Sequence, residues 1–259
     1  MCGINGFNFV NEDLIRKMNE STKHRGSDDD GFFISKNWSI GHNRLSIVDL
    51  SENGHQPMFN RNKSLAIIFN GEIYNFKEIK KELLDKGYKF FSKTDTEVIL
   101  YSYEEWGKDC LKKFNGMFAF AILDLKKEEI FLARDRIGIK PLYYYNKNGK
   151  FIFSSEIKAI LEHDIQSTLN LGALNIYFRF LYIPSPLTIF SDIHKLPLAH
   201  CASIKKNGDI NIEKYWEVNS FNEINNKEEI KEGISSLLKD SIKKRTMSDR
   251  SVGVFLSGE

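Results

Sequence analysis

The sequence of 259 residues has few of the features that mark secreted, membrane-bound or metal-binding proteins. Its three cysteines, Cys2, Cys110 and Cys201, lie far apart and form no C-x-x-C pair, so neither a disulfide framework nor a zinc site is indicated. No apolar run approaches the ~18 residues of a membrane span, and the N-terminus lacks the profile of a signal peptide. We therefore expect a cytoplasmic protein with no membrane partner and no bound metal, in which Cys110 and Cys201 are buried small apolar side chains.

A strong charge of one sign is also missing. The chain has 37 basic and 35 acidic residues, and no basic block or stripe suggests a nucleic-acid partner. The hydrophobic fraction of 41% is ample for a globular core, which argues against a disordered chain.

Apolar periodicity predicts strands and helices in mixed order, and hence layered α+β packing. Strands are expected at about 4–10, 32–34, 38–48, 64–69, 117–125, 129–134, 142–145, 150–153, 202–204 and 210–216, and helices at about 11–23, 75–87, 94–106, 155–162 and 171–180. The dipeptide Asn70-Gly71 predicts a turn at the end of its strand. Beyond a polar linker at 220–226, a helix around 230–242 and an apolar strand at 252–256 resemble the opening of a further α/β domain.

The first residues, Met1-Cys2-Gly3-Ile4, contain a candidate nucleophile. If Met1 is removed, Cys2 carries both a thiol with a pKa near ~8.5 and an α-amine with a pKa of roughly 7.7–8.0. The amine can then accept the thiol proton, so one residue supplies both nucleophile and base. By itself, a cysteine at this position is more often a chance feature of the sequence start than a nucleophile.

An amide-cleaving cysteine needs donors for an oxyanion and groups that hold the substrate. The Asn70 side-chain amide and the Gly71 backbone N–H suit an oxyanion hole, although Asn-Gly also serves simply to turn a chain. Arg44 is placed to bind a carboxylate through a bidentate guanidinium. Asp95 is placed to bind an ammonium group, although an acidic residue in the first turn of a helix is stabilising anyway.

The whole chain, in order, resembles the glutamine-dependent asparagine synthase family. The segments that carry the resemblance are Met1-Cys2-Gly3-Ile4, His24-Arg25-Gly26, Arg44 to Asp49, Asn70 to Asn75, Asn115 to Phe120, Arg134 to Tyr143, Ser154 to Lys158, Ser248-Asp249 and Val252 to Gly258. The resemblance implies a four-layer αββα N-terminal-nucleophile hydrolase sandwich, a class II glutamine amidotransferase domain at 1–218. A linker and the first helix and strand of an ATP-pyrophosphatase synthetase domain would follow at 219–259.

The resemblance also implies roles for particular residues. Cys2 would form a γ-glutamyl thioester and release ammonia, with Asn70 and Gly71 as the oxyanion hole. Arg44, Gly71, Glu72 and Asp95 would bind glutamine, and Leu256, Ser257 and Gly258 would begin a pyrophosphate loop. The glutaminase step needs no cofactor, whereas the complete enzyme would use ATP and Mg²⁺ to amidate aspartate to asparagine. A homodimer is compatible with the resemblance.

Three departures from the family pattern affect what can be expected. Ser27 replaces the usual Pro after His-Arg-Gly, and Leu196 to His200 differs from the usual Leu-Pro-Pro-Gly-His. The sequence reaches only Ser257-Gly258-Glu259 of the pyrophosphate loop. If the chain ends there, we expect no ATP site of its own; either a partner chain supplies that domain or the sequence is a fragment of a longer protein.

Two alternatives remain open at this point. The same chemistry would serve a sugar, peptide or natural-product carboxylate as acceptor, and a non-catalytic regulatory subunit would keep the fold without the activity. Amidotransferases directed to phosphoribosyl or fructose-6-phosphate substrates share the cysteine start, but the helix, strand and Ser-Gly ending fit them poorly.

Overall fold

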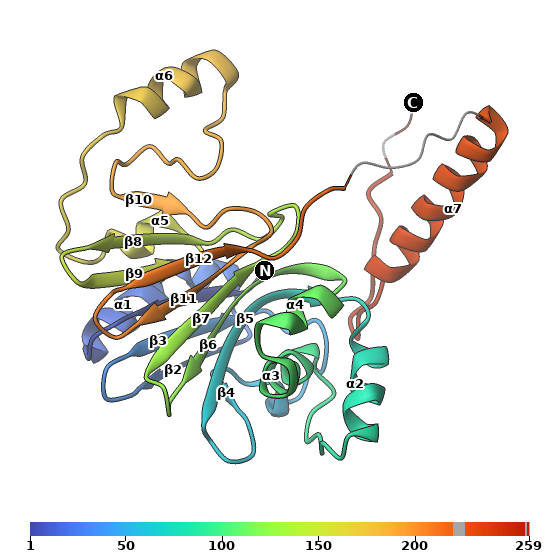
Figure 1. Cartoon of the computed structure of the whole chain (residues 1–259), viewed down its shortest axis with the longest axis horizontal. Coiled ribbons are helices and arrows are strands. Elements are labelled where there is room, and N and C mark those ends of the chain that lie inside the picture. Colours follow the sequence, from blue (N-terminus) through green and yellow to red (C-terminus); the bar gives the residue numbers. More distant parts are fainter. Residues whose placement is uncertain (220–225, 257, 259) are drawn as a thin grey trace.

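Two antiparallel sheets packed face to face organise the part of the chain that the computed structural model describes, residues 1–219, 226–256 and 258 (Figure 1). The first sheet has the order β10 (Ile193–Lys195), β8 (Tyr143–Lys147), β9 (Lys150–Ser154), β1 (Gly3–Phe7), β3 (Ser39–Arg44), β2 (Asp29–Ile34). The second has the order β12 (Ile210–Lys214), β11 (His200–Lys205), β7 (Glu129–Arg134), β6 (Gly116–Asp124), β5 (Leu65–Ile73), β4 (Met58–Phe59). Strand β1, which follows Cys2 directly, therefore lies inside the first sheet, between β9 and β3.

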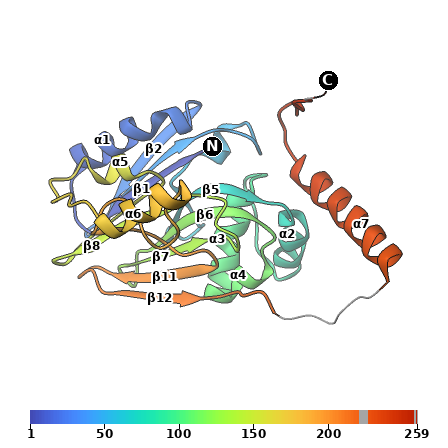
Figure 2. The same ribbon diagram turned by 90° about the horizontal axis from the view of Figure 1, so that it is seen from above.

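Helices cover the outer face of each sheet. Helices α1 (Glu12–Thr22) and α5 (Ile157–Ile160) lie on the first sheet, and α2 (Phe76–Asp85), α3 (Asp95–Trp106) and the short α4 (Cys110–Lys113) lie on the second (Figure 2). The resulting order is helix, sheet, sheet, helix, as expected from the sequence. Helices α6 (Leu171–Phe180) and α7 (Lys227–Arg245) extend away from this sandwich (Figure 1).

Successive side chains of β5 and β6 point to opposite faces of the sheet and so contribute to two hydrophobic cores. Small side chains such as Ala119 and Ala121 face the first sheet, whereas Phe118 and Phe120 face the helices. Since both faces of these strands are buried, their sequences are continuous apolar runs, and the two sheets approach each other over small side chains. A third core lies between the first sheet and helices α1 and α5.

The prediction of a turn at Asn70-Gly71 is wrong. Strand β5 continues through Ile73 and pairs with β6 as far as Gly116. A Cβ on Gly71 would lie 2.1 Å from the carbonyl oxygen of Met117 on β6. The glycine therefore permits a close approach of two strands rather than a change of chain direction.

The prediction of a strand at 252–256 is also wrong. These residues have no strand partner in the described part of the chain, and Val254, Phe255 and Leu256 are fully exposed. The helix expected around 230–242 is present as α7, with an exposed apolar face that includes Leu237 and Leu238. Residues 220–225 of the expected linker lie outside the described residues.

Smaller differences concern short elements. The helix expected at 155–162 is reduced to α5, and the short strands β4 and β10 were not predicted. Cys110 and Cys201 are buried, as expected. No helix in the described ranges is long and apolar enough to cross a membrane.

Candidate active site

A cavity of about 210 Å³ opens where the start of β1, the end of β3, the end of β5 and the start of α3 meet. The six residues proposed from the sequence for the glutamine site all line it: Cys2, Arg44, Asn70, Gly71, Glu72 and Asp95. Residues from four elements, up to 93 positions apart in the chain, are thus brought into one cavity by the two sheets and one helix.

The thiol of Cys2 lies against the backbone of Leu45. The Leu45 N–H donates to Sγ at 3.4 Å, and Sγ lies 3.7 Å from the Leu45 carbonyl oxygen. Burial raises the pKa of the Cys2 thiol, so formation of the thiolate in this cavity requires a base. Burial also lowers the pKa of the terminal amine, which here belongs to Met1. The α-amine of Cys2 itself becomes available as a base once Met1 is removed, because until then its nitrogen is part of a peptide bond.

The side chain of Arg25 holds the backbone of Cys2 in place. The Arg25 side chain donates from Nε to the Cys2 carbonyl oxygen at 2.9 Å and from Nη1 to Glu156 at 2.9 Å. Oε1 of Glu156 also lies 2.8 Å from Nε2 of His24, and its Oε2 lies 3.5 Å from Nζ of Lys158. Hydrogen bonds from Arg25 and His24 lower the pKa of Glu156, although its burial opposes this, so the carboxylate that orients Arg25 is ionised near neutral pH.

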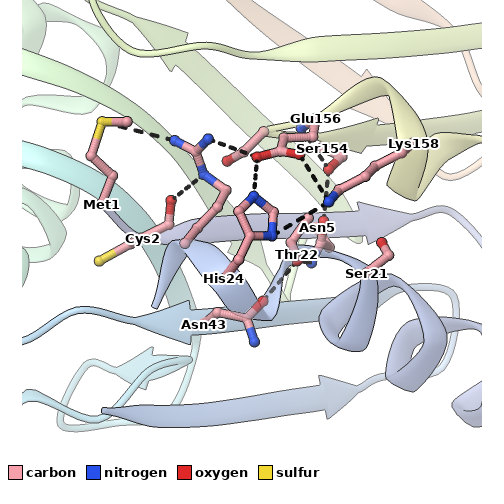
Figure 3. A network of polar contacts seen from close by, with 12 residues as sticks. Met1, Cys2, Asn5, Ser21, Thr22, His24, Asn43, Ser154, Glu156 and Lys158 are labelled. Atoms are coloured by element: carbon pink, nitrogen blue, oxygen red, sulfur yellow. Dashed lines mark hydrogen bonds and ion pairs between the residues drawn. The ribbon is translucent and has the colours of Figure 1, made fainter. Parts of the chain in front are cut away.

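A buried polar network supports the strand behind Cys2 (Figure 3). The Asn5 side chain donates to Thr22 at 2.9 Å and accepts from Ser154 at 2.7 Å, and Thr22 donates to Asn43 at 2.7 Å. These bonds satisfy buried polar groups and tie α1, β1, β3 and β9 together. Their effect is to fix the start of β1, and with it the position of Cys2.

The side-chain amide of Asn70 lines the cavity and has no hydrogen-bond partner among the described residues. Its side chain is 1% exposed, and neither Oδ1 nor Nδ2 has a hydrogen-bond partner within the described residues. A buried amide left without a partner is costly and indicates a ligand or a functional use. The preceding residue is held from the opposite sheet, because Nε2 of His42 lies 3.0 Å from the carbonyl oxygen of Phe69.

Arg44 is fixed by the loop that follows it. Its guanidinium donates to the carbonyl oxygens of Asp49 and, at 2.9 Å, Ser51. Gly54 packs directly against the guanidinium, since a Cβ there would lie 1.8 Å from Nη2. No carboxylate forms an ion pair with Arg44 in the described ranges, so its charge is available to an anionic ligand.

Asp95 and Glu72 contribute carboxyl groups to the lining of the cavity. Asp95 is 5% exposed and accepts a hydrogen bond from the Ile73 N–H at 2.9 Å. Burial, together with the nearby Glu72, raises the pKa of Asp95 to about 7. Burial also raises the pKa of Glu72, opposed by the charge of Lys140. A cationic ligand group would favour the ionised form of both carboxyls.

Gln56 and Lys140 are among the polar residues lining the cavity that sequence reasoning missed. Gln56 accepts from the Phe69 N–H at 2.7 Å and donates to Thr96 at 3.2 Å, so it ties the wall of the cavity to β5 and α3. Lys140 brings a second cation to the cavity from the loop after β7. Lys140 belongs to a segment that carried the family resemblance, which was the only available signal for it.

The pyrophosphate loop proposed from the sequence stays a prediction, because only two of its three residues are described. Leu256 is 93% exposed, and a Cβ on Gly258 would meet no atom within 4 Å. A phosphate cradle requires several backbone N–H groups converging at the start of a helix, and these two residues have no such surroundings. Ser257 lies outside the described residues. No step involving ATP can therefore be assigned to this part of the chain.

Comparison with known families agrees with this geometry. Residues 1–216 match the glutamine amidotransferase domain family. The chain belongs to this family. The resemblance predicted from the sequence motifs is thereby confirmed, and the amidotransferase domain accounts for all residues that line the cavity.

Several curated relatives carry asparagine synthetase names. A protein of Methanocaldococcus jannaschii named as an asparagine synthetase [glutamine-hydrolyzing] 2 is 42% identical over 290 aligned positions, covering 100% of this chain and 55% of that protein. Asparagine synthetase 3 of Bacillus subtilis is 38% identical and asparagine synthetase B of Escherichia coli is 32% identical, each over 100% of this chain and 43% of the relative. The chain thus spans about half the length of the curated relatives it matches.

Solved structures share the fold of the amidotransferase domain. The glutamine phosphoribosylpyrophosphate amidotransferase of B. subtilis superimposes with a TM-score of 0.62 at 20% identity, over 83% of this chain and 49% of that one. A structure described as the allosteric regulatory enzyme of purine biosynthesis gives a TM-score of 0.63 at 19% identity over the same shares. The expected four-layer αββα sandwich is therefore confirmed, whereas the ATP-pyrophosphatase part is not shown.

Proposed function

We propose that this amidotransferase domain hydrolyses glutamine to glutamate and ammonia with Cys2 as the nucleophile. The observation that supports this most directly is the placement of the partly buried Cys2 thiol and the Asn70 amide, which has no partner among the described residues, in one cavity. The same cavity holds the Arg44 guanidinium, whose hydrogen bonds go to carbonyl oxygens, and the buried Asp95 carboxyl. A free amino acid with a side-chain amide matches this set of groups in charge and hydrogen bonding.

Before any turnover, removal of Met1 frees the α-amine of Cys2. The amine takes the thiol proton, and Sγ attacks the side-chain amide carbon of glutamine. Negative charge develops on the amide oxygen, where the Asn70 Nδ2 and the Gly71 N–H donate hydrogen bonds. The protonated amine gives its proton to the leaving nitrogen, the C–N bond breaks, and ammonia departs from a γ-glutamyl thioester.

A water molecule completes the cycle. The amine of Cys2 accepts a proton from this water as it attacks the thioester carbonyl, and the C–S bond breaks to release glutamate and the thiol. During both steps Arg44 holds the glutamine carboxylate, and Glu72 and Asp95 hold its ammonium group. Losing one oxyanion donor typically costs roughly 2.7–4 kcal/mol in the barrier, so Asn70 is expected to affect kcat strongly.

We further propose that the ammonia serves ATP-dependent amidation of aspartate in a longer enzyme, of which residues 1–218 would be the glutaminase part. The names of the curated relatives support this choice over a sugar or peptide carboxylate acceptor. ATP, Mg²⁺ and the acceptor would be bound by residues other than those described here. Analysis of the product formed with aspartate and other carboxylates would distinguish the acceptors.

A glutaminase assay on the 259-residue chain tests the central proposal. Cys2→Ala should abolish glutamate release, while Cys110→Ala, which removes a buried thiol remote from the cavity, should retain it. Mass spectrometry should detect loss of Met1 in the active protein, because a retained methionine blocks the amine. Glutamate release by the Cys2→Ala variant would refute the assignment.

A further inference from the structure

A short segment beyond the family match returns to the wall of the glutamine cavity. After α7, residues Met247 to Arg250 contact the sandwich before the chain turns away toward its C-terminus (Figure 1). The segment lies outside residues 1–216, and the proposed glutaminase reaction assigns it no role. Ser248-Asp249 is nevertheless one of the motifs that carried the family resemblance.

Asp249 binds the cavity loop at two points. Its backbone N–H donates to the Ile47 carbonyl oxygen at 3.0 Å, and its carboxylate Oδ2 accepts from the Asp49 N–H at 2.8 Å. The two bonds span both ends of a three-residue stretch of the loop. Asp249 therefore restrains the loop backbone itself rather than a mobile side chain.

Arg250 extends the contact by one residue. Its Nε donates to the Ser46 carbonyl oxygen at 2.6 Å, and its Nη2 donates to Asp28 Oδ2 at 2.8 Å. The same Asp28 oxygen accepts from the Ser46 N–H at 2.9 Å, so the three residues close a ring of hydrogen bonds. The ion pair between Arg250 and Asp28 is partly exposed and contributes little to global stability on its own.

The restrained loop forms the part of the cavity that would hold the substrate carboxylate. Leu45, Ile47 and Val48 line the cavity, and the carbonyl oxygen of Asp49 accepts a bond from the Arg44 guanidinium. Asp49 has a φ of 57°, a left-handed conformation that a non-glycine residue keeps only when its surroundings enforce it. The hydrogen bond that the Asp49 N–H donates to the Asp249 carboxylate is one of these enforcing contacts.

We propose that Asp249 and Arg250 are positioning residues for glutamine binding. They hold loop 45–51 in the shape that fixes Arg44 and the apolar wall of the cavity. The proposal rests on the proposed glutaminase function and assigns the segment an effect on substrate affinity, not on bond cleavage. Asn70 lies on β5 and Cys2 directly precedes β1, and the loop reaches the Cys2 thiol through the backbone of Leu45. The segment bonds to the loop farther along, at Ser46, Ile47 and Asp49, so its main effect is expected on the part that fixes Arg44.

Steady-state kinetics on the full 259-residue chain test the proposal. Asp249→Ala and Arg250→Ala should each raise the KM for glutamine by about tenfold, as expected for loss of charge-assisted hydrogen bonds, with kcat within about twofold. Asp240→Ala is the matched control, because it removes an exposed ion pair with Lys244 on α7 and should leave both constants unchanged. Equal kcat and KM in the Asp249→Ala variant and the parent would overturn the proposal, as would a loss confined to kcat.

A double-mutant cycle separates positioning from a general structural effect. If Asp249 acts through Arg44, Asp249→Ala should change KM much less in an Arg44→Lys background than in the parent. Additive effects of the two substitutions on KM would show that Asp249 does not act through Arg44. Hydrogen exchange of the amides of residues 45–51 should be faster in Asp249→Ala than in Asp240→Ala. This measurement requires no activity, so it still decides whether the segment holds the loop if the parent protein fails to hydrolyse glutamine.

Discussion

Replacing Asp95 with asparagine is expected to stabilise the ligand-free protein above neutral pH and to weaken glutamine binding. The Asp95 carboxyl is buried, and its pKa is raised from 3.8 to about 7. Its position in the first turn of α3 favours the ionised form by only about 0.3–1 kcal/mol, so burial dominates. Asparagine has a similar shape and can still accept the hydrogen bond from the Ile73 N–H through its side-chain oxygen.

The pH dependence follows from the raised pKa of Asp95. The folded state binds this proton more tightly than the unfolded chain, so the associated stability is present at low pH and is lost as the pH rises from 3.8 to about 7. The full difference corresponds to about 4 kcal/mol at most. Between pH 5 and pH 8 the parent should therefore lose about 3 kcal/mol relative to the Asp95→Asn variant.

Urea unfolding at pH 5 and pH 8 measures this difference. Glu97→Gln is the control on the same helix, because the Glu97 carboxylate accepts bonds from the Phe91 N–H at 3.0 Å and the Ser92 N–H at 2.8 Å. Weakening these charge-assisted bonds should destabilise the protein at both pH values. If Asp95→Asn were equally or less stable than the parent at pH 8, the argument from burial would be refuted.

Asp95→Asn should impair glutamine binding even though it stabilises the ligand-free fold. The ammonium group of glutamine requires an ionised Asp95, so the KM of the parent should rise as the pH falls below about 7. The Asp95→Asn variant should have a raised KM with a weaker dependence on pH in this range. A KM unchanged by the substitution would contradict the role proposed for Asp95.

Three further substitutions probe the packing and the nucleophile. Gly71→Ala places a Cβ 2.1 Å from the Met117 carbonyl oxygen. The free energy of unfolding in urea should fall by at least about 1–3 kcal/mol, and glutaminase activity should also fall. A variant of unchanged stability would contradict the close approach of the two strands. Glu156→Gln removes the ion pair that orients Arg25 and should lower kcat roughly tenfold with little change in KM, which initial rates will measure. Phe120→Ala opens a cavity under the helices of the second sheet and should cost about 3–5 kcal/mol in thermal unfolding, whereas a loss below about 1 kcal/mol would show that Phe120 is not packed as described.

The order of elements was predictable because burial leaves a periodic pattern in the sequence. Strand β7 and helix α6 have the bounds expected from the pattern alone. The dipeptide Asn70-Gly71 was misinterpreted because a glycine that allows two strands to approach is indistinguishable, within one segment, from a glycine that turns the chain. Only the partner strand β6 decides between them.

The site was predictable where chemistry singles out a residue type. Cys2, Arg44, Asn70 and Asp95 carry groups that amide hydrolysis needs, and the ordered motifs placed them in a known family. Gln56 was missed because its role depends on contacts with segments 13 and 40 positions away. The contacts of the segment after α7 were missed for the same reason, since they join residues about 200 positions apart.

The two halves of the site are held by different parts of the structure. Cys2 precedes β1 of the first sheet and Asn70 lies on β5 of the second, so the distance between nucleophile and amide is set by the core between the sheets. The contact between His42 and Phe69 joins the sheets beside Asn70, and burial lowers the pKa of His42 to about 4, which keeps it neutral in the range of the assays. Arg44, in contrast, depends on a loop that is held from outside by the segment after α7. Substitutions in the sheet core should therefore change kcat, and substitutions in the loop or the segment should change KM.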